Sequence, residues 1–101
     1  MKKIITYIND EQKADEITEV LLKEKLVACF NILPGKSSYW WKGNIEKTNE
    51  FTLMIKTKDS LVEETINKIK EIHPYDLLAI EVIHIERSTE GVEEWIDEVT
   101  K

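Results

Sequence analysis

The segment KEIHPYD at residues 70–76 holds the side chains of this chain that are most suited to chemistry. His73 lies directly before Pro74, and a proline ends a helix that reaches it. A helix C-terminus favours an imidazolium, and a ring N–H there can donate to the last carbonyls, so a structural role alone explains this histidine. Two other roles stay open, a residue of a binding pocket and a metal ligand. One histidine does not make a tight metal site, so ligation needs further ligands.

Cys29 is the only cysteine of the chain and the second candidate for metal chemistry. Its neighbours Ala28 and Phe30 favour a small buried hydrophobic side chain. A soft ligand for copper(I) is the alternative. A single cysteine forms no internal disulfide, which agrees with a reducing compartment, and we therefore expect a cytoplasmic protein.

Composition limits the classes of partner. The chain has 101 residues, the size of one domain covering residues 1–101. Its net charge is −6 and its only arginine is Arg87. Nucleic acids and anionic membrane surfaces are therefore disfavoured, because their phosphates attract basic patches. No apolar run approaches the ~20 residues that span a bilayer. The acidic balance suits small cationic ligands, but it equally suits simple solubility.

Hydrophobic periodicity predicts an alternation of strands and helices. We expect strands at residues 4–8, 26–33, 50–57 and 78–86, with the second ended by Pro34-Gly35 and a further extended stretch at 38–42 before a Gly43-Asn44 turn. We expect three helices. The first covers residues 11–25, and the second runs from a cap at Asp59 or Ser60 to Pro74. The third covers residues 89–100 and directs Val92, Ile96 and Val99 inward. This order, β-α-β-β-α-β plus a C-terminal helix, predicts an α+β, ferredoxin-like domain. Two helices would cover one face of a four-stranded antiparallel sheet, and the other face would need separate cover.

The middle of the chain carries an unusual aromatic run. Tyr39, Trp40 and Trp41 are consecutive in an extended segment, so they point to alternate faces and one core cannot bury all of them. The hairpin around them can run from Leu33 to Thr57, and long hairpins rarely stand alone in water. The rings either cap the open sheet face, form an oligomer interface, or stack against a small molecule.

Four segments carry a resemblance to a known family. They are LVACFNILPG at 26–35, SSYWWKGNIE at 37–46, MIKT at 54–57 and HPYD at 73–76. In this order and spacing they resemble the CutA divalent-cation-tolerance family over nearly the whole chain. The resemblance implies a compact homotrimer of ferredoxin-like subunits whose hairpins pair across chains. It also implies kinship in fold with the nitrogen-regulatory PII proteins and a link to tolerance of copper and other divalent cations.

The chain departs from the family at several positions. The family usually has Pro and Glu where this chain has Leu78 and Ala79, which removes a carboxylate from the usual pocket. Ile72 and Thr6 stand where some members have a second histidine and a cysteine. A copper site built from those ligands would retain only His73.

The residues and the resemblance together define the functional expectations. The candidate metal ligands for copper or another divalent cation are His73 and Cys29, and the candidate ligand pocket comprises Tyr39, Trp41, Lys56, His73, Tyr75 and Asp76. We expect a homotrimeric CutA-like protein associated with divalent-cation tolerance that binds metal weakly. The alternatives are a PII-like sensor that binds an anion or metabolite in intersubunit clefts, and a non-enzymatic trimeric scaffold.

An enzyme is the least supported reading of the sequence. Acylphosphatases share the expected fold, but their phosphate loop after the first strand needs an arginine, and here that loop reads NDEQK. The chain also lacks a P-loop, GxSxG, HExxH or CxxC motif.

Overall fold

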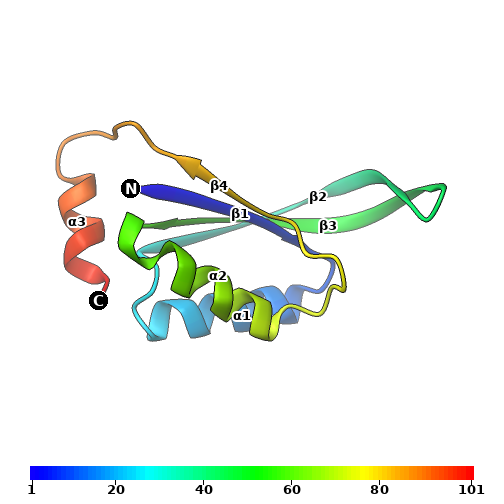
Figure 1. Cartoon of the computed structure of the whole chain (residues 1–101), viewed down its shortest axis with the longest axis horizontal. Helices are drawn as coiled ribbons and strands as arrows, with labels where there is room; N and C mark the ends of the chain where they lie inside the picture. Colours follow the sequence, from blue (N-terminus) through cyan, green and yellow to red (C-terminus); the bar gives the residue numbers. More distant parts are fainter.

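The computed structural model describes all 101 residues, which form one antiparallel sheet with two helices on one side and the C-terminal helix at one end (Figure 1). The elements are β1 (Lys2–Ile8), α1 (Glu11–Lys23), β2 (Cys29–Trp41), β3 (Asn44–Thr57), the 3₁₀ turn η1 (Asp59–Leu61), α2 (Val62–Ile72), β4 (Ile80–His84) and α3 (Val92–Val99). The strand order β2-β3-β1-β4 confirms the ferredoxin-like prediction. None of the helices has the length and apolar character needed to cross a membrane.

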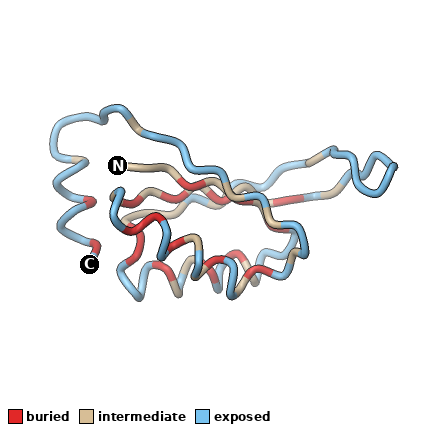
Figure 2. The backbone as a smooth tube through the Cα atoms, in the orientation of Figure 1, coloured by how far each residue is buried: buried red, intermediate tan, exposed pale blue.

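The core lies between the sheet and the helices α1 and α2, where Figure 2 shows the buried stretches gathered. The side chains of a strand alternate between the two faces of its sheet, and every second residue is buried from Ile4 to Ile8 in β1 and from Leu53 to Thr57 in β3. The fully buried apolar residues from these strands and from α1 and α2 are Ile4, Ile8, Leu53, Ile55, Ala14, Ile17, Leu21 and Ile69. In α1 they follow the helical repeat and form one inner face.

The helices α1 and α2 begin in different ways. Asp10 caps α1 as expected, since its side chain accepts a hydrogen bond from the backbone N–H of Lys13 at 3.2 Å. The predicted cap of the second helix is wrong. The chain makes the turn η1 first, and the Asp59 carboxylate accepts a hydrogen bond from the N-terminal ammonium at 2.6 Å. This ammonium lowers the pKa of Asp59 and binds the oxygens that a helix cap would need.

The long hairpin differs from the predicted segments. β2 does not end at residue 33 but continues through Pro34 and Gly35, which pair with Phe51 and Glu50 of β3. A proline fits here because β2 is an edge strand, where a missing N–H can face away from the sheet. β3 likewise begins at Asn44 rather than at residue 50.

The hairpin tip is a two-residue turn placed one residue earlier than predicted. Trp41 pairs with Asn44, which leaves Lys42 and Gly43 as the turn residues. Both have positive φ angles, 50° and 81°, as a type I′ turn requires. The turn matches the right-handed twist of its strands, so the two arms continue paired up to the tip.

The C-terminal elements are shorter than predicted. β4 covers Ile80–His84 rather than residues 78–86, and α3 covers Val92–Val99 rather than residues 89–100. Ile96 is buried as expected, but Val99 is 37% exposed. Thr100 is buried in place of Val99, and its hydroxyl donates to the carbonyl of Ile96. The chain leaves α3 at this point, and the backbone N–H of Lys101 donates to the carbonyl of Lys25.

Replacement of a core side chain should test this packing. Leu53→Ala removes a fully buried side chain in the centre of the sheet, so we expect the free energy of unfolding to fall by about 2–5 kcal/mol. Urea denaturation at one fixed protein concentration measures it. Leu77→Ala is the control, because Leu77 is 71% exposed and its loss should cost at most about 0.5 kcal/mol. Equal effects of the two substitutions would contradict the assignment of the core.

Candidate functional site

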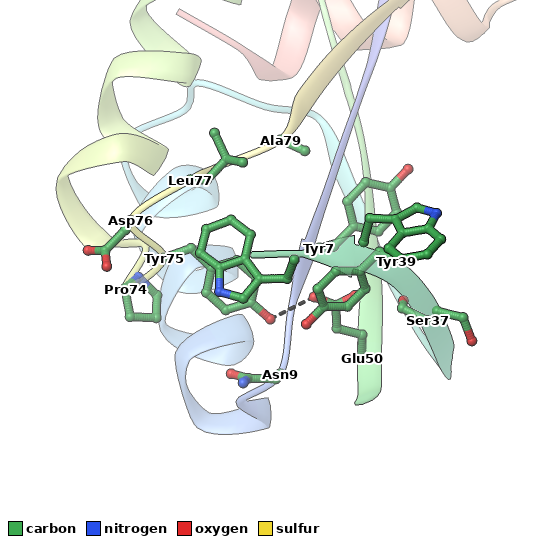
Figure 3. A pocket seen from close by; sticks show the side chains of 13 residues that line it. Tyr7, Asn9, Ser37, Tyr39, Glu50, Pro74, Tyr75, Asp76, Leu77 and Ala79 are labelled. Atoms are coloured by element: carbon green, nitrogen blue, oxygen red, sulfur yellow. Dashed lines mark hydrogen bonds between the residues drawn. The ribbon is translucent and has the colours of Figure 1, made fainter. Parts of the chain in front are cut away.

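A pocket of about 720 Å³ lies where the arms of the hairpin, the end of β1 and the loop between α2 and β4 meet (Figure 3). Its lining residues are Tyr7, Asn9, Ser37, Ser38, Tyr39, Trp40, Trp41, Glu50, Pro74, Tyr75, Asp76, Leu77 and Ala79. The volume falls within the range of small-molecule sites, roughly 300–1,000 Å³.

A buried carboxylate forms part of the pocket wall. Glu50 in β3 is only 9% exposed, and the hydroxyl of Tyr75 donates to its Oε2 at 2.7 Å (Figure 3). Pro74 ends α2 and turns the chain, so that Tyr75 reaches back to the sheet. Burial, together with the bond to Glu50, raises the pKa of Tyr75 far above its usual value. Tyr75 therefore keeps its proton and acts as a permanent donor to Glu50.

A second tyrosine joins the pocket to the edge of the sheet. The hydroxyl of Tyr7 in β1 donates to Oε1 of Glu81 in β4 at 2.9 Å. This hydrogen bond is the main cause that raises the pKa of Tyr7, and burial adds to it. The ring of Tyr7 is thus held at the pocket by a contact to the neighbouring strand.

His73 lies behind the pocket and holds its loop in place. Its Nδ1 accepts a hydrogen bond from the backbone N–H of Tyr75 at 3.2 Å, so Nε2 carries the ring proton and donates to Tyr7 O at 2.7 Å. The two rings meet edge to face, with 4.6 Å between the centroids of His73 and Tyr75. Both ring nitrogens are therefore engaged within the chain.

His73 is neutral, which corrects the expectation that the helix end would favour an imidazolium. The side chain is only 7% exposed. Burial lowers its pKa, and this effect outweighs the carbonyl of Tyr7 and the charge of Glu50, both of which favour the imidazolium. His73 also closes α2, since its backbone N–H donates to Ile69 O at 2.8 Å. The histidine is at once the end of a helix and the support of a pocket loop.

The structure brings together most of the predicted pocket residues, but not all of them. Tyr39, Trp41, Tyr75 and Asp76 line the pocket. His73 does not line it but lies behind it, and Lys56 lies six positions beyond Glu50 along β3, where it pairs with Cys29.

Glu50 and Tyr7 line the pocket, although neither belongs to the predicted set of pocket residues. The alternation of β3 gives the available signal for Glu50, since it places Glu50 on the same face as Met54, opposite the buried Leu53 and Ile55. Nothing in the sequence indicates its partner Tyr75, which is 25 residues away along the chain.

The two candidate metal ligands do not share a site within one chain. Cys29 pairs with Lys56, whereas His73 contacts Tyr7, which pairs with Thr52. The two rows are four residues apart along β3, or about 13 Å at ~3.3 Å per residue. No group of three or more His, Cys, Asp or Glu side chains is arranged to hold a metal ion. A divalent cation therefore does not fit the pair His73 and Cys29 in a single chain.

Comparisons with known proteins agree with this fold over the whole chain. A family model described as "CutA1 divalent ion tolerance protein" matches residues 3–99. The divalent-cation tolerance protein CutA of Pyrococcus horikoshii is 39% identical over 98 residues, which cover 97% of this chain and 96% of that protein. A crystal structure of CutA1 from the same organism gives a TM-score of 0.95 at 38% identity, covering 100% of this chain and 99% of that one. A structure from Archaeoglobus fulgidus, described as a periplasmic divalent cation tolerance protein CutA, gives a TM-score of 0.95 at 36% identity and covers 100% of both chains.

Burial of neutral His73 should make the stability depend on pH. Its folded pKa lies below the ordinary value of 6.5, so the unfolded chain takes up the proton first as the pH falls. Above about pH 6.5 the contribution of neutral His73 to the free energy of unfolding should be fully present. Below about pH 6.5 this contribution should decline, by at most about 1.4 kcal/mol per pH unit, until the pH has passed the folded pKa. Urea titrations between about pH 7.5 and about pH 5 measure this slope.

The comparison of two histidine variants isolates this contribution. His73→Gln should be less stable at all pH values, and it should lose the part of the slope that comes from the buried ring. His84→Gln is the matched control, because it removes the other, exposed histidine and should retain that slope. An unchanged slope in His73→Gln would contradict the account of a buried neutral imidazole.

Proposed function

This chain belongs to the CutA1 divalent ion tolerance protein family, and on that premise we propose that it works in divalent-cation tolerance as a non-enzymatic homotrimer. The family match agrees with the resemblance found in the sequence. The observation that supports assembly is the apolar surface that one chain leaves uncovered on its open sheet face and on its hairpin.

The open sheet face carries apolar side chains with no helix above them. α1 and α2 lie on one side of the sheet only (Figure 1). Alternation and register place Ile5, Met54, Leu33 and Ile83 on the other side, where Leu33 is 45% exposed and Ile83 is 46% exposed. Exposed apolar side chains on a sheet face that no helix covers are typical of an interaction site.

The hairpin presents a second uncovered surface. It projects beyond the helices (Figure 1), and near its tip Trp40 pairs with Ile45. Trp40 is 72% exposed and Ile45 is 59% exposed. An isolated two-stranded hairpin is only marginally stable in water, and the outer edge of β2 has unpaired backbone groups. Pairing with the hairpins of further copies would stabilise the hairpin and supply partners for these backbone groups. The family resemblance implies an assembly of three chains.

The engaged state of the polar groups supports a non-enzymatic role. A general base needs a free nitrogen or oxygen directed at a substrate proton. Both nitrogens of His73 are hydrogen-bonded within the chain, so this histidine has no free nitrogen for that role. We also propose that the protein is cytoplasmic. Its single cysteine, Cys29, is a free thiol, which agrees with a reducing compartment.

Disruption of the hairpin tip should break the assembly. Native mass spectrometry of the wild-type protein should give the mass of three chains. Trp40→Asp places a charge in the proposed interface, so we expect it to shift most of the protein to the mass of one chain. A fluorescence measurement in a Trp95→Phe background should show a blue-shifted spectrum for the trimer, because at least one of Trp40 and Trp41 is buried between chains.

A substitution elsewhere on the surface provides the control. Leu22 lies on α1 and is 41% exposed, so Leu22→Asp should leave the three-chain mass unchanged. The assembly proposal fails if the wild-type protein has the mass of one chain, or if Trp40→Asp remains a trimer.

Copper binding should not depend on His73. Because both of its ring nitrogens are already engaged, His73→Gln should take up as many copper ions per trimer as the wild type in a native mass titration. Cys29→Ser tests the half-buried thiol in the same way. Uptake by the wild type that is lost in His73→Gln would make His73 a ligand and contradict this part of the proposal.

A further inference from the structure

We propose that the pocket between the hairpin and the α2–β4 loop binds a small organic cation, an alkylated ammonium group held between aromatic rings and Glu50. The inference goes beyond the proposed function, since it needs no metal ion and all the lining residues come from one chain. It requires that the proposed assembly of the hairpins leaves this pocket open. Three properties of the pocket carry it, namely its charge, its rings and the state of its buried carboxylate.

The charged residues of the pocket are all acidic. Glu50 and Asp76 belong to the lining, and no lysine or arginine does. Lys56, the cation expected there from the sequence, lies at the far end of β3 from Glu50. One ammonium lies beside the wall, that of Lys42, 5.7 Å from the centre of the Trp41 ring. The two carboxylates of the lining still outnumber it, so the pocket attracts a cation more than an anion.

Aromatic rings supply most of the apolar wall. Tyr39, Trp40 and Trp41 come from the hairpin, Tyr7 from β1 and Tyr75 from the α2–β4 loop. The faces of such rings attract cations, and several rings around one site are the recognised way to hold an alkylated ammonium group. This group is weakly hydrated, so the apolar wall can replace its water at small cost.

The buried carboxylate has one oxygen left for a ligand. Tyr75 donates to Oε2 of Glu50, and Oε1 makes no hydrogen bond within the chain. The side chain is 9% exposed, so its attraction for a cation is less screened than at the surface. The hydroxyl of Tyr75 fixes the position of the carboxylate, and His73 fixes Tyr75 in turn.

A metal ion fits this pocket less well than an organic cation does. Calcium and magnesium take about six or more oxygen ligands, and the softer metals favour nitrogen or sulfur ligands. The lining provides two carboxylates and no histidine or cysteine, and no metal-holding group of three such side chains exists in the chain. The rings would contribute little to a small hydrated ion but much to a bulky ammonium group.

A pair of ligands of the same shape tests the role of the positive charge. Choline and 3,3-dimethylbutan-1-ol differ only in that a carbon atom replaces the ammonium nitrogen. Calorimetric titration of the assembled wild-type protein should give a dissociation constant for choline at least about tenfold lower than for the neutral alcohol. Equal affinities would overturn the proposal, and so would the absence of choline binding, for instance because another copy fills the pocket. Displacement of choline by equimolar copper or zinc would also overturn it, in favour of a metal site.

Variants of the pocket locate the binding. Glu50→Gln keeps an acceptor for Tyr75 but removes the charge, and we expect choline affinity to fall by about tenfold. Tyr39→Leu removes a ring that is 40% exposed, so this variant should fold even if Glu50→Gln does not, and we expect a similar loss. Glu63→Gln removes the same charge from an exposed position on α2 and should bind choline as the wild type does. Choline binding by Tyr39→Leu equal to that of the wild type would overturn the proposal.

Discussion

A sheet that carries helices on one face only leaves its other face to be covered by something outside the chain. Here this constraint governs most of what the surface does. The helices α1 and α2 bury the inner residues of β1 and β3, whereas no helix covers the outer residues of the same strands. The hairpin extends beyond the helices and adds uncovered aromatic area. Association with further copies is the simplest way for such a chain to remove this area from water.

His73 links the core to the surface at the end of the sheet from which the hairpin projects. It closes α2 with its backbone, binds the end of β1 with one ring nitrogen and holds the pocket loop with the other. Tyr75 then reaches Glu50 and fixes it in the wall of the pocket. A residue type that suggests metal chemistry thus serves to position other side chains, and the pocket gains a preorganised carboxylate from it.

The sequence predicted the layers of the fold better than the site. Alternation in β3 and the helical face of α1 are local patterns, so they could be read directly. The end of β2 could not, because tolerance of Pro34 depends on the position of its strand at the edge of the sheet. The neutral state of His73 depends on its burial, and the role of Glu50 depends on a tyrosine that is distant along the chain. Long-range contacts of this kind leave no local signal.

The central claim is that the hairpin is covered by other copies of the chain, and hydrogen exchange of its backbone amides tests it most directly. The account predicts that the amides of residues 36–48 exchange as slowly as those of β1, and that they exchange faster as dilution dissociates the protein. Fast exchange of these amides at every protein concentration, beside a protected β1, would mean that the hairpin stands free in solution and would contradict the account.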